Sequence, residues 1–190
     1  NEIVFVKGLG TRQDKINREL QIAKFLGKQY NCEKMELLER AVSIAKADLT
    51  TEMVYEFTEL QGIMGGYYAK QLGEAPEVVT AIYEQYFPNS ENGELPSTVL
   101  SAIVAISYKL DLLFALFSIG HIPTGSRDPF GLRRAVNGIL RIVLKHNLKF
   151  NFDEVLDNLV ENYKQIDRKI LKKFISERII NFYKDINPSI

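Results

Sequence analysis

Apolar side chains recur every three or four residues along most of this chain, the spacing that places them on one face of an α-helix. Polar, glycine- and proline-containing stretches separate the periodic segments, and Thr11 with Asp14 forms a capping pair before the first. Residues 3–6 could pair as a short strand or lie extended. The pattern therefore predicts an all-α fold with helices over residues 11–29, 33–47, 59–72, 75–86, 97–117, 128–145, 151–163 and 167–183.

The predicted helix over residues 97–117 is apolar on most of its sides, so we expect it at the centre of the fold. Ser97 is its expected N-cap. The next predicted helix has Asp128 as its expected N-cap and Pro129 at its first position, where the missing N–H of proline is not needed. We therefore place a helix start directly after the Pro/Gly-bounded loop over residues 122–126.

Length and composition fit one soluble globular domain, or one domain with an appendage. The chain has 190 residues, of which 46% are hydrophobic and 25% are charged, and these values are ordinary for such a protein. The balance of charged and apolar residues changes after Asn147. We therefore expect residues 1–150 to form one helical domain, and residues 151–190 to form a helical extension or a linker to the next domain.

Membrane and disulfide signals are missing from the sequence. No uninterrupted apolar run approaches the ~20 residues of a membrane span, and the longest candidate, residues 110–120, is broken by Asp111. The single cysteine, Cys32, excludes an internal disulfide and a cysteine-based zinc site. We therefore expect a cytoplasmic protein with no membrane partner.

The formal net charge of zero hides a segregation of charge along the chain. Residues 47–104 hold one Lys/Arg against nine Asp/Glu, a net charge of −8, whereas residues 105–149 hold seven against two, a net charge of +5. A local basic patch can bind nucleic acid whatever the total charge. The acidic segment either faces a basic protein surface or keeps the protein soluble, and solubility is the simpler interpretation.

The basic segment contains a loop that runs into a helix. A helix N-terminus presents unpaired N–H groups and a partial positive charge, and Gly125 and Ser126 let a ligand approach the backbone closely. One face of the helix carries Arg134, Gly138, Arg141 and Lys145. Such a stripe suits a phosphate backbone, although the spacing alone favours a solvated charged face. The candidate phosphate contacts are Arg127, Arg133, Arg134, Arg141 and Lys145.

Few residues qualify for catalysis. His121 and His146 are the only histidines, and neither has an acidic partner at ligand spacing on the same helix. Ser126 lacks the Gly-x-Ser-x-Gly setting of a nucleophile. The glycines within residues 62–66 lack the lysine of a phosphate-binding loop and sit in a helical pattern, which favours tight helix packing.

Asp48 and Asp111 interrupt otherwise apolar helices. A carboxylate on an inward face needs a cation or several N–H donors. Each is therefore either a helix cap or one half of a buried salt bridge. Arg133 and Arg134 differ by about 100° around their helix, so one of them could pair with Asp111 or another acid inside the fold.

Several longer stretches carry a family resemblance. They occur in the expected order and spacing, and they include Lys46-Ala47-Asp48-Leu49-Thr50-Thr51-Glu52, Glu56-Phe57-Thr58-Glu59-Leu60-Gln61-Gly62, Lys109-Leu110-Asp111 and Ile122-Pro123-Thr124-Gly125-Ser126-Arg127-Asp128-Pro129-Phe130-Gly131-Leu132-Arg133-Arg134. Over about residues 5–150 the chain resembles the beta subunit of bacterial glycyl-tRNA synthetase. The last forty residues resemble that family only loosely.

The resemblance implies a fold similar to the HD-domain superfamily of helical metal phosphohydrolases. The hallmark of that superfamily is a histidine, a His-Asp pair and a distant aspartate, all of which bind metal. Here the pair reads Ala47-Asp48, no histidine occurs in the first 120 residues, and Asp111 matches the distant aspartate. The resemblance therefore implies an HD-like helical bundle without a metal site or catalytic residues, in which Asp48 and Asp111 are structural.

The resemblance also implies a function. The family enzyme joins glycine to its tRNA with ATP and magnesium, as an assembly of two alpha and two beta subunits in which the beta subunit grips the tRNA. This chain would then be a tRNA-handling module that contacts the acceptor stem, chiefly through Arg133, Arg134 and Arg141. The alternative is a degenerate HD scaffold that organises domains within the beta subunit without touching tRNA.

Overall fold

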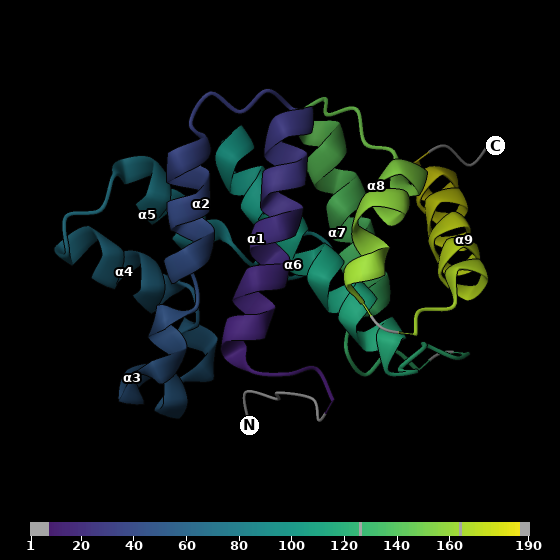
Figure 1. Cartoon of the computed structure of the whole chain (residues 1–190), viewed down its shortest axis with the longest axis horizontal. Coiled ribbons are helices and arrows are strands. Elements are labelled where there is room, and N and C mark those ends of the chain that lie inside the picture. The colour runs from purple at the N-terminus through teal and green to yellow at the C-terminus, as the bar shows by residue number, and fades with distance from the viewer. Residues whose placement is uncertain (1–7, 126, 164, 187–190) are drawn as a thin grey trace.

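The computed structural model describes residues 8–125, 127–163 and 165–186, and these residues fold into helices with no strand longer than one isolated bridge (Figure 1). The all-α prediction is confirmed, whereas the expected extended segment over residues 3–6 lies outside the described residues. The helices are α1 (Arg12–Gln29), α2 (Met35–Ile44), η1 (Ala47–Thr50), α3 (Glu52–Glu56), η2 (Thr58–Leu60), α4 (Ile63–Gln71), α5 (Pro76–Glu84), α6 (Val99–Ser118), α7 (Leu132–Lys145), α8 (Phe152–Leu159), η3 (Val160–Asn162) and α9 (Arg168–Ile186).

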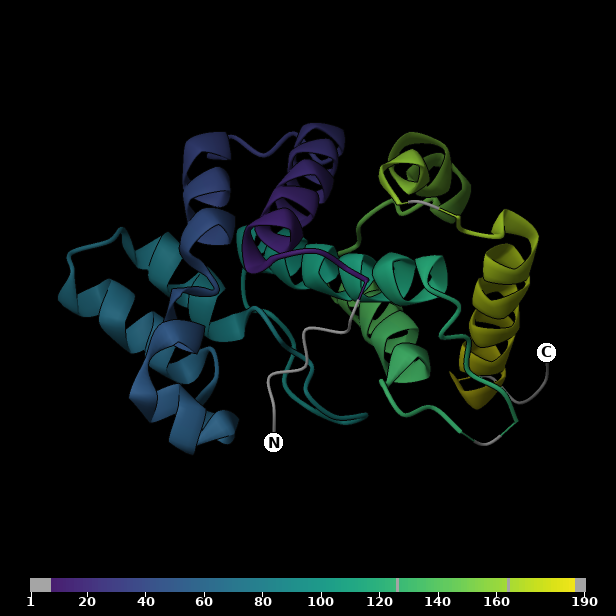
Figure 2. The ribbon, with the colours of Figure 1, turned by 60° about the horizontal axis from the view of Figure 1, so that its bottom comes forward.

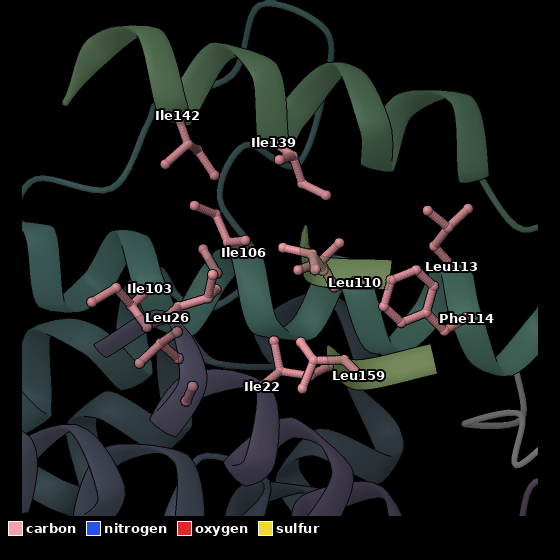
Figure 3. Packing of buried hydrophobic residues seen from close by; sticks show 14 of the residues in the cluster. Ile22, Leu26, Ile103, Ile106, Leu110, Leu113, Phe114, Ile139, Ile142 and Leu159 are labelled. Carbon is pink, nitrogen blue, oxygen red and sulfur yellow. The ribbon is translucent and has the colours of Figure 1, made fainter. Parts of the chain in front are cut away.

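Helix α6 is the centre of the molecule, as its sequence predicts. It packs against α1, α5 and α7, with α4 and α5 at one end of the molecule and α8 and α9 at the other (Figures 1 and 2). Side chains from α1, α7 and α8 meet those of α6 in one apolar core, shown by Ile22, Leu26, Ile103, Ile106, Leu110, Ile139, Ile142 and Leu159 (Figure 3). Burial of this surface is the main driving force for the fold.

Helix α6 also corrects one expectation from the sequence. Although no uninterrupted apolar run reaches membrane length, this 20-residue helix is long and apolar enough to cross a membrane. Its apolar residues continue past Lys109 and Asp111, which interrupt the run without ending the helix. In this fold 83% of the apolar window is buried inside the protein, as expected for the core helix of a bundle.

The C-terminal helices share this core. Val155, Leu156 and Leu159 of α8 belong to the buried cluster. The ring of Phe174 from α9 lies 5.3 Å, between centroids, from that of Phe117 of α6. Residues after position 150 therefore cover apolar surface on α6 and α7 that would otherwise face water.

The helix starts follow capping chemistry, with two corrections. Thr11 and Asp14 form the predicted capping box of α1. The cap of α6 is Thr98 instead of Ser97, because the Thr98 hydroxyl accepts from the backbone of Ser101 while the Ser97 N–H is bound elsewhere.

Helix α7 begins at Leu132, four residues after the predicted cap Asp128. Residues 128–131 instead form a turn closed by the Gly131 N–H and the Asp128 carbonyl, with Pro129 at its second position. Gly131 has φ +69°, which ends the turn and starts the helix. The Asp128 carboxylate still accepts from the first helical N–H groups, those of Leu132 and Arg133, at 2.7 and 2.9 Å.

The predicted helix over residues 59–72 is divided at Gly62. This glycine has φ +81°, and α4 starts directly after it. Gly65 and Gly66 then lie against α5, where an added Cβ would come 2.9 Å from Ile82 Cγ2 and 3.0 Å from Tyr83 Cβ. The prediction that these glycines permit tight helix packing is confirmed.

Candidate nucleic-acid interface

A groove of about 1080 Å³ lies between the loop over residues 88–95 and the helices α6 and α7, and residues of η2 and α9 also line it. Five cationic side chains line this groove against three acidic ones, so it carries excess positive charge. The cations are Lys109, Arg133, Arg134, Arg141 and Lys145, and the acids are Glu59, Glu91 and Asp185. The groove is the candidate site on the described part of the chain.

Four of the five predicted phosphate contacts line this groove, and Arg127 does not. Arg127 is exposed and forms an isolated antiparallel bridge with Thr124. Its carbonyl accepts from Arg133 Nη1 at 3.4 Å. Ser126, which directly precedes Arg127, is outside the described residues. The loop therefore supports the helix start instead of joining the groove.

Arg141 and Lys145 fasten the opposite loop to α7. The Arg141 guanidinium donates to the carbonyls of Glu91 and Gly93, the latter at 3.0 Å. Lys145 Nζ donates to the carbonyl of Pro96 at 2.8 Å. Because these acceptors are neutral backbone groups, the positive charges of both side chains stay uncompensated in the groove.

The adjacent arginines Arg133 and Arg134 have different surroundings. Arg133 is half-buried, and its Nη2 donates to the Gly125 carbonyl at 2.6 Å. Arg134 is exposed and stacks over its own helix start, where a Cβ on Gly131 would come 2.8 Å from Arg134 Nη2. Of the four predicted contacts that line the groove, Arg134 is the one whose side chain donates no hydrogen bond to the described residues, whereas Arg133, Arg141 and Lys145 each donate to backbone carbonyls.

Lys109 lines the groove from α6, and nothing in its sequence context singled it out as a binding residue. Its side chain is 4% exposed, and its Nζ donates to the Tyr86 carbonyl at 3.0 Å. A Cβ on Gly138 would come 2.8 Å from Lys109 Cε. Gly138, which lies within the basic face of α7, therefore makes room for a lysine from the neighbouring helix. The sequence feature that could have indicated Lys109 is the presence of a lysine inside an apolar helix.

Asp111 sits at the centre of a buried ionic cluster. It lies 2.7 Å from Lys15 Nζ and 2.7 Å from Arg18 Nε, and it accepts from the Tyr163 hydroxyl at 2.7 Å. Burial by itself would raise the pKa of Asp111, but the charges and hydrogen bonds of Lys15 and Arg18 outweigh burial and lower it. The hypothesis that Arg133 or Arg134 pairs with Asp111 is wrong, because α1 provides both of its cations.

Lys46 lies deeper in the same region. It is fully buried, with its Nζ 3.4 Å from Glu19 Oε2 and a hydrogen bond to the Gln85 side chain. Its ammonium also faces the rings of Tyr86 and Tyr108 at 4.8 and 4.9 Å from their centroids. Burial lowers the pKa of Lys46, and Glu19 opposes that effect.

Asp48 is engaged separately from Asp111. Its Oδ2 accepts from the N–H groups of Gly62 and Gly65 at 2.7 and 3.1 Å, so it caps α4, while its Oδ1 accepts no hydrogen bond. Among the residues that the structure describes, no three His, Cys, Asp or Glu side chains are grouped to hold a metal ion. Asp48 and Asp111 therefore do not fit a metal centre, because backbone amides engage the first carboxylate and cations engage the second.

Comparisons with known proteins agree on one family. The family model described as "Glycyl-tRNA synthetase beta subunit" matches residues 1–189. A glycine–tRNA ligase beta subunit of Helicobacter pylori (strain Shi470) is 52% identical and covers 99% of this chain, and one of Bacillus subtilis is 48% identical and covers 81%. The chain spans 28% and 23% of these relatives. On this evidence the chain belongs to the glycyl-tRNA synthetase beta-subunit family.

Proposed function

We propose that this chain is a tRNA-handling module of the beta subunit of a glycine–tRNA ligase, an enzyme that attaches glycine to its tRNA in the cytoplasm. The single observation that carries the proposal is the groove, in which cations from α6 and α7 gather without enough acids to neutralise them. A nucleic-acid backbone is the ligand that such a surface attracts by charge and counterion release.

The proposed ligand is the acceptor stem of glycine tRNA. An A-form stem offers phosphates and 2′-hydroxyl groups in its shallow minor groove, so a protein recognises it by shape and charge instead of by base sequence. Backbone carbonyls in the loop over residues 88–96 are already held by α7. This loop would keep the groove open at a fixed width before the tRNA arrives.

The cations of the groove have separate proposed roles. Arg134 is exposed and would contact a phosphate directly. Arg133, Arg141 and Lys145 would position the two loops while keeping their charges in the groove. Arg127 lies outside the groove lining, so it would act only if the tRNA extends past the start of α7.

The proposal for the whole enzyme includes ATP, magnesium and an alpha subunit in a two-alpha, two-beta assembly. We place none of the adenylation chemistry on this chain, because its buried carboxylates are engaged by cations and amides. We also propose that residues 1–150 are a degenerate HD-like domain, and that residues 151–190 are its helical extension, since α8 and α9 cover its core.

A second candidate function is a scaffold that organises neighbouring domains of the beta subunit without touching tRNA. The observation that favours it is a group of exposed apolar side chains on α3, α4 and the turns after them. Tyr55 is 75% exposed and Leu72 is 82% exposed, and Phe57 and Tyr67 are also exposed. Large exposed apolar side chains that gather into a patch are typical of protein contacts, and these four lie in the acidic segment.

The discriminating experiment is a titration of the chain with glycine tRNA at low salt and at about 0.15 M salt. Arg134→Ala should weaken binding roughly tenfold at low salt, because it removes one charged phosphate contact, and it should leave the melting temperature unchanged. The matched control is Lys173→Ala on α9, which removes one exposed charge outside the groove lining.

The scaffold function predicts instead that Arg134→Ala leaves tRNA binding unchanged. If no tRNA binds at either salt, or if Arg134→Ala and Lys173→Ala weaken binding equally, the groove is not the tRNA site. Arg141→Ala should lower the melting temperature under both candidate functions by releasing the loop that it holds at Glu91 and Gly93, and only the tRNA-binding function predicts that it also weakens tRNA binding.

A further inference from the structure

Two lysines are buried among the described residues, Lys46 and Lys109, and only one of them lacks an acidic partner there. The half-buried Lys15 lies 2.8 Å from Glu19 and 2.7 Å from Asp111. Lys46 lies 3.4 Å from Glu19. Lys109 forms no salt bridge with any carboxylate of the described residues, and its one hydrogen bond to these residues goes to a neutral carbonyl. An ammonium group has three N–H donors, so two of those on Lys109 remain for a ligand.

Lys109 lies beside Gly138 of α7, at the lining of the groove. Its side chain passes beside Gly138, where a Cβ would come 2.8 Å from Lys109 Cε. Arg134 lies about one turn before Gly138 and Arg141 lies about one turn after it. All four residues line the same groove. The glycine therefore opens a place on α7 where the buried Lys109 side chain reaches the groove, with Arg134 and Arg141 about one turn to either side on the same helix.

We propose that Lys109, flanked by Arg134 and Arg141, forms a binding site for a single phosphate group in the groove. A phosphate accepts several hydrogen bonds at once and carries the negative charge that this part of the protein lacks. This proposal rests on the proposed function in one respect, which is where the phosphate group comes from. That source is either a backbone phosphate of tRNA or free phosphate, and the two are distinguished below.

The electrostatics of the site support this assignment. Burial, reinforced by the charge of Lys46, lowers the pKa of Lys109 to about 7. The other groups close to it are the backbone carbonyl of Tyr86 and the ring of Tyr108, with Arg134 and Arg141 in the groove. A bound phosphate would favour the charged amine, so its binding should take up a proton and should weaken as the pH rises through 7.

The first test measures the affinity for glycine tRNA at pH 6 and at pH 8.5. The wild-type chain should bind about tenfold more weakly at the higher pH, which corresponds to the loss of one charge-assisted contact. Lys109→Met should bind weakly at both values. Lys149→Met, which removes an exposed lysine outside the groove, should keep the pH dependence. The comparison of the two variants with the wild type assigns the effect to Lys109.

A second measurement needs no variant and no tRNA. The Lys109 amine is followed by NMR while sulfate, which stands in for phosphate and does not titrate between pH 6 and 8.5, is added to the wild-type chain. We expect sulfate to raise the titration midpoint of Lys109 by at least half a pH unit. A midpoint that does not change overturns the anion site, whether or not Lys109→Met folds.

The two measurements separate the possible failures. If sulfate shifts Lys109 but tRNA does not bind, the phosphate site stands with free phosphate as its ligand, and the proposed function fails. If tRNA binds the wild type and Lys109→Met with the same pH dependence, the proposed function stands and the phosphate site is overturned. Displacement of sulfate by polyglutamate but not by tRNA would assign the site to acidic protein segments and overturn its nucleic-acid source.

Discussion

At the scale of single residues, charged side chains in the interior of this protein pair with side chains of opposite charge. Asp111 is fully buried, yet it has two cationic partners from α1 and a hydroxyl donor from Tyr163, directly after η3. Removing one member of such a cluster leaves the others charged in a low-dielectric interior, which costs more than the loss of the contact itself.

Asp111→Asn should therefore destabilise the protein by about 3–5 kcal/mol, because it leaves Lys15 and Arg18 without their carboxylate. Urea unfolding at pH 7 measures this. The control is Asp157→Asn, which breaks an exposed pair with Arg168 and should cost less than about 1 kcal/mol. Equal costs for the two variants would mean that the buried cluster adds nothing to stability.

The same residue predicts a pH dependence. The folded-state pKa of Asp111 lies below its ordinary value. Its stabilisation is therefore fully present above the unfolded-state pKa of about 4 and is lost as the pH falls through the folded-state pKa. Wild-type stability should fall on acidification below pH 4 more steeply than that of Asp111→Asn.

At the scale of elements, glycine decides how closely two helices approach. Gly65 lies in α4, where helix propensity alone favours alanine by about 1 kcal/mol. The neighbouring helix prevents this gain, because the Cβ would come 2.9 Å from Ile82 Cγ2 and 3.1 Å from the Asp48 carboxylate. The packing of α4 on α5 and the cap of α4 depend on the same small residue.

Gly65→Ala should thus destabilise the protein by about 1–3 kcal/mol through overpacking. Thermal unfolding followed by circular dichroism measures the change. Gln71→Ala, an exposed position of the same helix, should stay within about 0.5 kcal/mol of the wild type. A stabilised Gly65→Ala variant would show that α4 and α5 can move apart without loss.

At the scale of the whole molecule, the question is whether the last forty residues are an appendage. Val155, Leu159 and Phe174 are buried in the common core, and Tyr163 donates to Asp111. The proposed division at residue 150 therefore separates regions of different sequence character that still share apolar surface and one polar contact.

Truncation after residue 150 should lower the melting temperature and expose apolar surface on α6 and α7, which dye binding and thermal unfolding measure. The polar share of that loss is tested by Tyr163→Phe, which keeps the ring against Phe114 and removes only the bond to Asp111. It should cost about 1–2 kcal/mol. A truncated chain that is as stable as the full one would make residues 151–190 an independent linker.

The sequence by itself determined what depends on neighbours along the chain. The helical periodicity, the central place of the apolar helix and the capping box at Thr11 follow from local spacing and composition. The basic stripe of α7 was also visible, because residues three and four apart share a helix face. Exact starts were less predictable, since Asp128 caps α7 from outside the helix through a turn.

Only the tertiary structure decided which partners the charged residues have. Nothing in the local sequence says that Lys15 pairs with Asp111, 96 residues away, or that Arg141 holds the loop at Gly93. The local sequence also does not show that Lys109 lies beside Gly138, or that it lacks an acidic partner among the described residues. Charge pairing in a folded interior depends on distances through space and on burial, and both are properties of packed helices.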